Sequence, residues 1–222
     1  MKKIAITLIM LLSLAAGASA QYYQIASQIP SLISPALSGS FSYKGFVEAY
    51  GLAGIGNNRA NIVGVSTSQG FKYASWFFMG VGIGLDVAMS HDGDTWAYEG
   101  QAPDYWNHPS SSTKVMVPVF TDFRFDLGDQ KSIRAYIDLK LGASWLMGSS
   151  YLQLQHGRLG GTTQFYLKPS VGIRIPVSKA NPKQAVSIGL TYQMLTSNDN
   201  YAWWYRDGVT LSTLGLAVAF EW

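Results

Sequence analysis

The stretch FFMGVGIGLDVAMS at residues 77–90 decides the fold. Its odd-numbered residues are all large and apolar, whereas its even-numbered residues are mostly glycine or small and polar. Successive side chains of a strand point to opposite faces, so this period of two predicts a β-strand with one apolar face. The water-facing side of a soluble strand usually carries lysine and glutamate, but here the second face is dominated by glycine. Small residues suit the interior of a narrow barrel, so we predict a barrel with its apolar side outward.

Seven further segments show the same alternation. They are residues 41–53, 59–71, 117–126, 135–145, 165–175, 185–194 and 211–222. Each is near the roughly 9–11 residues with which a tilted strand crosses a bilayer. In hydrocarbon every backbone N–H and C=O group must be paired within the protein, and a closed barrel with an even number of strands achieves this. We therefore predict an all-β, eight-stranded, antiparallel, up-and-down transmembrane β-barrel.

The N-terminus has the organisation of a secretory signal. Lys2 and Lys3 precede an apolar stretch at residues 4–16, and Ala18-Ser19-Ala20 has the small residues of a cleavage site. A membrane-anchor helix is the alternative, but the apolar stretch is shorter than the roughly 20 residues that a helical span needs. We therefore predict export from the cytoplasm and three parts: a cleaved signal peptide at 1–20, a periplasmic segment at 21–40 and an outer-membrane barrel at 41–222.

Composition excludes several classes of protein. The 222 residues include no cysteine, which excludes a disulfide scaffold, an iron–sulfur cluster, a zinc–thiolate site and a cysteine nucleophile. Lysine and arginine number 16 against 13 acidic residues, and removal of the signal with Lys2 and Lys3 leaves 14 against 13. Because no basic cluster remains, we expect no nucleic-acid partner. The acidic residues around Asp92 lack the order of a calcium loop, so we expect no metal, and no motif indicates a cofactor.

Loop lengths predict the topology. Short connections alternate with long ones: 71–76, 127–133 and 177–184 are short, whereas 90–114, 146–163 and 195–209 are long. Short turns are typical of the periplasmic end of such barrels, and long loops of the extracellular end. Aromatic residues near the strand ends indicate the two membrane interfaces. We expect Trp76, Phe77, Phe125 and Trp222 at the periplasmic rim and Trp145, Phe165 and Tyr192 at the outer rim.

Three runs carry a resemblance to a known family. GFVEA at 45–49, PVFTDFR at 118–124 and IDLK at 137–140 resemble a family of small, mostly uncharacterised outer-membrane β-barrels with OmpX/OmpA-like architecture. The resemblance covers roughly residues 41–222 and implies a barrel in the bacterial outer membrane, but it implies no reaction. The segment 21–40 lies outside the pattern.

The last strand has the character of an assembly signal. It ends in an alternating apolar series that closes on tryptophan: Leu214, Leu216, Val218, Phe220 and Trp222. This series resembles the C-terminal signal by which the barrel-assembly machinery recognises its clients. We therefore expect that machinery as a partner, a monomeric barrel, and outer-membrane lipid and lipopolysaccharide as its surroundings.

Charged residues on the inward face predict the state of the lumen. They are Glu48, Asp86, Asp122, Asp138 and Glu221 as acids, and Arg124, Lys140, Lys168 and Arg174 as bases. An unpaired ion in so narrow a space would cost several kcal/mol, so these groups should pair. An eight-stranded barrel is just wide enough for side chains to fill. We predict a salt-bridged, closed lumen; the alternative is a narrow ion or solute pore lined by the same residues.

Aromatic residues of two outer loops suggest a surface role. They are Trp96, Tyr98, Tyr105 and Trp106 in one loop, and Tyr201, Trp203, Trp204 and Tyr205 in the other. Exposed aromatic clusters commonly mark binding sites, so we predict binding of a surface glycan or protein. Alternatively these rings pack on one another or lie in the lipopolysaccharide interface.

A lipid-modifying enzyme is the remaining alternative. Some eight-stranded barrels, such as lipid A palmitoyltransferase and lipid A deacylase, act on lipid A with a histidine near the outer leaflet. His91 lies between Ser90 and Asp92, and His108 lies two residues before Ser110. An acyl-transfer site needs a nucleophile, a base and an orienting acid held in fixed geometry. Because neither cluster lies within a strand that would hold that geometry, we predict no catalytic residues and no enzyme.

Overall fold

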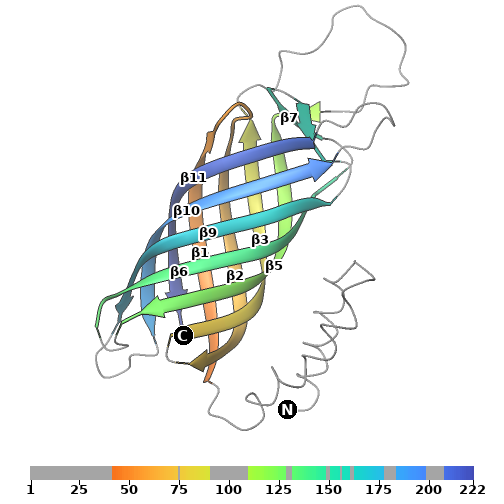
Figure 1. Cartoon of the computed structure of the whole chain (residues 1–222). Helices are drawn as coiled ribbons and strands as arrows, with labels where there is room; N and C mark the ends of the chain where they lie inside the picture. Colours follow the sequence, from red (N-terminus) through yellow and green to blue (C-terminus); the bar gives the residue numbers. More distant parts are fainter. Residues whose placement is uncertain are drawn as a thin grey trace, which may run out of the picture. The chain divides into compact units, whose positions relative to one another are not determined.

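The chain forms a closed barrel of eight antiparallel strands in the order β1-β11-β10-β9-β6-β5-β3-β2 (Figure 1). The computed structural model describes residues 42–74, 76–90, 110–128, 132–148, 151–155, 157–160, 163–177, 184–198 and 208–222. The barrel strands are β1 (Ser42–Ile55), β2 (Ala60–Ala74), β3 (Phe77–Ser90), β5 (Thr113–Leu127), β6 (Arg134–Leu146), β9 (Gln164–Pro176), β10 (Ala185–Asn198) and β11 (Gly208–Glu221). The predicted all-β, eight-stranded antiparallel barrel is therefore confirmed.

The barrel closes between its first and last strands. Phe46 on β1 is the register partner of Glu221 on β11. The Trp222 backbone N–H donates to the Gly45 carbonyl at 3.1 Å, and the Gly45 N–H donates to the Trp222 carbonyl at 3.2 Å. A Cβ atom at Gly45 would collide with the Trp222 ring, so glycine allows the indole to lie over β1. Closure leaves no unpaired strand edge along these residues.

Most strands are longer than the alternation predicted. β3 has the predicted bounds, but β5 begins at Thr113 rather than at residue 117, and β10 continues to Asn198 rather than ending at 194. The extensions lie toward the long loops. There the inward face includes buried apolar side chains, such as Met116 on β5 and Leu195 on β10. In β5 the flanking outward residues Val115 and Val117 are apolar as well, so the alternation disappears, whereas in β10 the next outward residue is Thr196 and the regular alternation ends although the strand continues.

A small second sheet occupies connections that the sequence analysis treated as loops. β4 (Ser110–Ser111) pairs in parallel with β7 (Tyr151–Leu154), and β7 pairs antiparallel with β8 (Gly157–Leu159). The connection 146–163, predicted as a long loop, therefore contains a short hairpin. β7 contacts β3 and β5, whereas β8 contacts β11, which lies four strands from β5 around the ring. The β7–β8 hairpin therefore crosses one end of the barrel (Figure 1).

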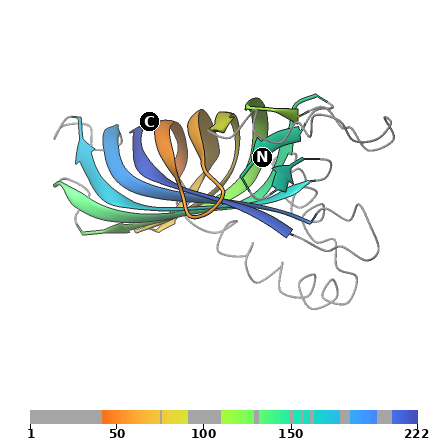
Figure 2. The ribbon, with the colours of Figure 1, turned by 90° about the horizontal axis from the view of Figure 1, so that it is seen from above.

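The two ends of the barrel differ in their connections. We call the end with the short connections 75–76, 128–133 and 177–184 the turn end, and the opposite end, which holds β4, β7 and β8, the loop end. The strands curve round a common interior, as Figure 2 shows. No helix long and apolar enough to cross a membrane occurs in the described part of the chain.

The two faces of the barrel wall have opposite chemistry. Large apolar side chains are exposed on the outside of every barrel strand, among them Val65, Ile83 and Leu216, which is 63% exposed. Charged side chains, by contrast, are buried inside. Glycines on the inner face make room for large rings, since a Cβ atom at Gly82 would collide with the ring of Phe120. The predicted orientation of the two faces is therefore the one observed.

Candidate functional site

Apart from Lys114, the buried charged side chains of the described barrel fall into two groups. We call the first the central cluster; it consists of Glu48, Asp86, Asp122, Asp138, Lys140 and Lys168, all of them buried. Every member was predicted to point inward. Four carboxyl groups accompany two lysines, so this cluster holds an excess of acidic groups.

Glu48 joins opposite walls of the barrel. Its Oε2 atom lies 2.8 Å from Lys140 Nζ, and its Oε1 atom lies 2.5 Å from Lys168 Nζ. Glu48 is on β1, and Lys140 is on β6, four strands away in a ring of eight. Lys140 also donates to Asp138 Oδ2 at 3.0 Å. The ion pairs of Glu48 therefore cross the lumen rather than running along its wall.

A second polar connection crosses the lumen through Asp86. Gln193 Nε2 donates to Asp86 Oδ2 at 3.0 Å, and the two residues lie on β10 and β3, again four strands apart. The hydroxyl of Tyr50 donates to the other oxygen of Asp86. Elsewhere in the central cluster, Ser68 Oγ donates to Asp122 Oδ2 at 2.5 Å. These bonds link strands that lie two or four places apart around the barrel.

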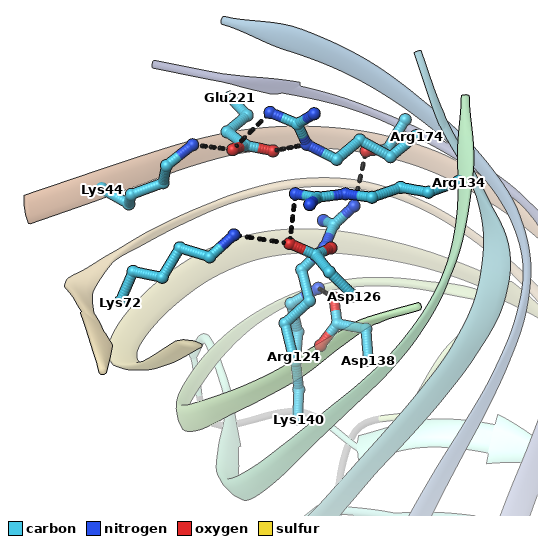
Figure 3. Close-up of polar contacts among 10 residues, drawn as sticks. Lys44, Lys72, Arg124, Asp126, Arg134, Asp138, Lys140, Arg174 and Glu221 are labelled. Carbon is cyan, nitrogen blue, oxygen red and sulfur yellow. Dashed lines mark hydrogen bonds and ion pairs between the residues drawn. The ribbon is translucent and has the colours of Figure 1, made fainter. Parts of the chain in front are cut away.

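The second group, the terminal cluster, lies at the turn end (Figure 3). It consists of Lys44, Lys72, Arg124, Asp126, Arg134, Arg174 and Glu221, all buried. Glu221 accepts from Arg174 Nε at 2.6 Å and from Arg174 Nη2 at 2.9 Å, and it also pairs with Lys44. Asp126 Oδ2 lies 2.9 Å from Lys72 Nζ and 2.5 Å from Arg134 Nη2.

Arg124 links the terminal cluster to aromatic rings. Its guanidinium carbon lies 3.8 Å from the ring centroid of Tyr136 and 4.8 Å from that of Phe46. Its Nη2 atom donates to Ser187 Oγ at 2.5 Å, and its Nε atom lies 3.6 Å from Asp126 Oδ1. The charge of Arg124 is therefore stabilised partly by ring faces, which attract cations electrostatically.

The sequence analysis missed two cations of the terminal cluster. Lys72 and Arg134 each lie one residue beyond a segment whose alternation was recognised. Lys72 shares its parity with Ser68, and Arg134 shares its parity with Asp138, so extension of the strands by one residue would have found both. Lys44 and Asp126, also absent from the predicted lumen residues, belong to the terminal cluster as well.

An apolar layer fills the loop end of the lumen. We call it the outer plug; its barrel residues are Leu52, Ile62, Met116, Leu195 and Leu211, and its hairpin residues are Leu152, Leu154 and Leu159. All eight are buried. The hairpin leucines come from β7 and β8, so the element that crosses the barrel mouth also packs against the apolar barrel wall. The sequence analysis did not predict this layer.

Other predicted residues lie outside the lumen or outside the described residues. The assembly-signal residues project outward from β11 or follow it, with Leu214, Leu216, Val218, Phe220 and Trp222 exposed. Their assembly role stays a prediction.

Two sets of predicted residues lie outside the described residues. All eight aromatic loop residues fall within 91–109 and 199–207, and the three histidines are residues 91, 108 and 156. Among the residues that are described, no group of His, Asp and Glu side chains has the arrangement of a metal site.

Comparison with known proteins agrees with this architecture. No protein-family model matches the sequence, and no curated protein matches it. The solved structure of Neisserial surface protein A (NspA) matches with a TM-score of 0.50 at 12% identity, over 82% of this chain and 98% of NspA. The chain has the fold of this small barrel. The predicted resemblance to small OmpX/OmpA-like barrels is thus confirmed for the fold.

Two further solved structures are similar at lower scores. The outer membrane enzyme PagL matches with a TM-score of 0.48 at 16% identity, over 78% of this chain and 97% of PagL. The N-terminal β-barrel domain of OprF from Pseudomonas aeruginosa matches with a TM-score of 0.40 at 14% identity, over 82% of this chain and 100% of that domain. The prediction that the present chain is not an enzyme stays a prediction.

Proposed function

We propose that this protein is an integral outer-membrane β-barrel with a closed lumen, which holds extracellular loops at the cell surface. The observation that carries the proposal is the inverted distribution of side chains. Charged residues such as Glu48 and Arg174 are buried inside, whereas aliphatic residues such as Leu216 are exposed outside.

This inversion favours lipid over water around the barrel. A barrel in water would bury its aliphatic residues, because each Å² of apolar surface removed from water contributes about 25 cal/mol. Here all eight strands expose large apolar side chains on the outside, and a hydrocarbon environment is the one that covers them. Closure of β1 on β11 also satisfies the backbone groups, as hydrocarbon requires.

Aromatic residues at both ends of the barrel support its position across a membrane, and the short connections of the turn end favour the periplasmic side for that end. At the turn end the rings of Trp76 and Phe125 stack with centroids 6.1 Å apart, and Phe220 stacks on Trp222 at 6.3 Å. Toward the loop end, Trp145 donates a hydrogen bond to Thr163 at 3.0 Å. Two aromatic rims on one barrel are typical of the two membrane interfaces.

The filled interior supports a closed barrel rather than a pore. Glu48 and Asp86 each bond to the opposite wall, and the outer plug covers the loop end. Planar-bilayer recording on the purified chain, refolded in detergent, tests this part of the proposal. We expect no unitary current steps from the wild type. Steps whose ion selectivity changes in Glu48→Gln would instead establish the narrow pore.

Because side-chain bonds cross the described lumen and an apolar layer covers its loop end, we place ligand recognition on the extracellular loops. Their aromatic residues, including Trp203 and Trp204, would stack on a surface glycan or anchor a protein partner. The test measures binding of whole cells or of barrel-containing nanodiscs to a glycan array and to extracellular-matrix proteins. A ligand that is lost in Trp203→Ala and Trp204→Ala, but kept in Trp76→Ala at the turn end, is the expected result. Modification of lipid A by the wild type would favour the enzyme instead.

A further inference from the structure

Two pairs of like charges face each other inside the barrel on the same two strands. Lys140 on β6 is the register partner of Lys168 on β9, and Arg134 on β6 is the register partner of Arg174 on β9. Like charges directly opposite each other destabilise a sheet unless an opposite charge compensates them. For the lysine pair, the compensating group is Glu48, which bonds to both ammonium groups.

The arginine pair is arranged differently. Arg174 pairs with Glu221, whereas Arg134 pairs with Asp126, so each guanidinium has its own carboxylate. Both carboxylates are shared further, because Lys44 also pairs with Glu221 and Lys72 also pairs with Asp126. Each carboxylate of the terminal cluster therefore pairs with more than one cationic side chain.

The turn end consequently carries an excess of positive charge. Five cationic side chains of the terminal cluster accompany two carboxylates, an excess of three among the described residues. The neighbouring carboxylate Asp138 already binds Lys140. Buried charge without compensation is costly, so an anion at this end would stabilise the barrel.

A buried donor atom supports the presence of such an anion. Arg124 Nε has no hydrogen-bond partner in the described part of the chain, because Asp126 Oδ1, with which it forms an ion pair, is 3.6 Å away, and the side chain is only 3% exposed. It belongs to the third guanidinium group of the same cluster, beside those of Arg134 and Arg174 (Figure 3). Guanidinium groups present planar pairs of N–H donors that match the oxygens of phosphate, and several together are typical of phosphate recognition.

We propose that the terminal cluster is a binding site for a phosphate group, with Arg134 and Arg174 as its principal ligands. The site lies near the end of the barrel, because Arg134 is the first residue of β6 and Arg174 lies two residues before the end of β9. Long side chains at that position can turn toward an anion that arrives from the turn end. Inorganic phosphate and the headgroup of a phospholipid in the facing leaflet present the same chemistry.

The first experiment uses inorganic phosphate on the refolded chain in a zwitterionic detergent. Thermal unfolding is followed by tryptophan fluorescence while sodium phosphate is titrated, against sodium chloride at the same ionic strength and pH. A ligand that binds only the folded state raises Tm in a saturable manner. We expect a saturable rise with phosphate beyond that with chloride.

Variants locate the site. Arg134→Gln and Arg174→Gln should lose the phosphate-specific rise, whereas Arg134→Lys and Arg174→Lys should weaken the apparent affinity about tenfold, because lysine keeps the charge but loses the planar donors. Arg59→Gln is the matched control, since Arg59 is exposed in the β1–β2 connection at the loop end. Heat-modifiable migration on gels verifies folding. If the glutamine variants do not fold, the lysine variants and the wild-type titration decide the outcome.

The second experiment tests the lipid source. The chain is placed in nanodiscs of phosphatidylcholine and phosphatidylglycerol at four to one, and retained lipid is identified by native mass spectrometry. Selective retention of phosphatidylglycerol, lost in Arg134→Gln and kept in Arg59→Gln, assigns the site to a lipid headgroup. A phosphate response without such retention assigns it to soluble phosphate. The site is disproved if neither response exceeds its control, or if Arg59→Gln reduces them equally. The detergent titration does not depend on the proposed membrane location.

Discussion

Lys140 and Lys168 lie opposite each other on neighbouring strands inside the barrel, and one carboxylate from the far wall bonds to both. That carboxylate belongs to Glu48 on β1. The arrangement converts a like-charge pair, which would separate β6 from β9, into a connection across the lumen. The same three side chains thereby stabilise the barrel and occupy its centre.

The first prediction concerns Glu48. Glu48→Gln should lower the free energy of unfolding by about 3–5 kcal/mol, because removal of one member of a buried ion pair leaves its partners without compensation. Urea unfolding of the refolded barrel in detergent or lipid vesicles measures the change. The double variant Glu48→Gln/Lys168→Gln should recover part of the loss, since Lys140 keeps Asp138. Equal stability of the single and double variants would contradict the bridging role.

The second prediction concerns Arg124. The nearby carboxylate of Asp126 keeps two other cationic partners, so the loss of Arg124 acts mainly through its ring contacts. Arg124→Ala should cost about 2–4 kcal/mol by leaving a space between the rings of Phe46 and Tyr136. Arg124→Met should cost less, because methionine still fills that space. The order of the two unfolding midpoints checks this, and equal losses for the two variants would indicate that the charge is the main contribution.

The third prediction tests the position of the bilayer. Leu216 lies midway along β11 and faces outward, so Leu216→Arg should destabilise the vesicle-inserted barrel by about 2–4 kcal/mol. Leu127, at the end of β5, is exposed at the turn end, and Leu127→Arg should cost only about 0–1 kcal/mol. Equilibrium unfolding from lipid vesicles compares the two. Equal costs would show that no apolar slab surrounds the middle of the barrel.

The fourth prediction separates the outer plug from the polar interior. Leu154→Ala should lower the free energy of unfolding by about 2–5 kcal/mol, because it leaves a cavity among buried leucines. The half-buried neighbour Gln153 provides the control, and Gln153→Ala should have little effect. Planar-bilayer recordings of Leu154→Ala should remain silent, since the bonds of Glu48 and Asp86 across the lumen are unchanged. Current steps in this variant would show that the outer plug alone closes the barrel.

The sequence by itself determined the number of barrel strands and the direction in which their side chains face. This is because the period of two is local: in residues 77–90 each side chain's face follows from its parity alone. The inward positions of Glu48, Lys140 and Arg174 could be predicted in the same way.

Only the tertiary structure decided which side chains meet. Glu48 and Lys140 are 92 residues apart in the sequence, and their contact depends on closure and on the strand register. The outer plug was hidden for a related reason: Leu195 shares its inward face with Gln193, and Leu211 shares its inward face with Thr213, so a parity that indicates a polar lumen gave no sign of an apolar layer. Contacts across a barrel depend on the circumference and the stagger of its strands, and neither quantity is a property of any single strand.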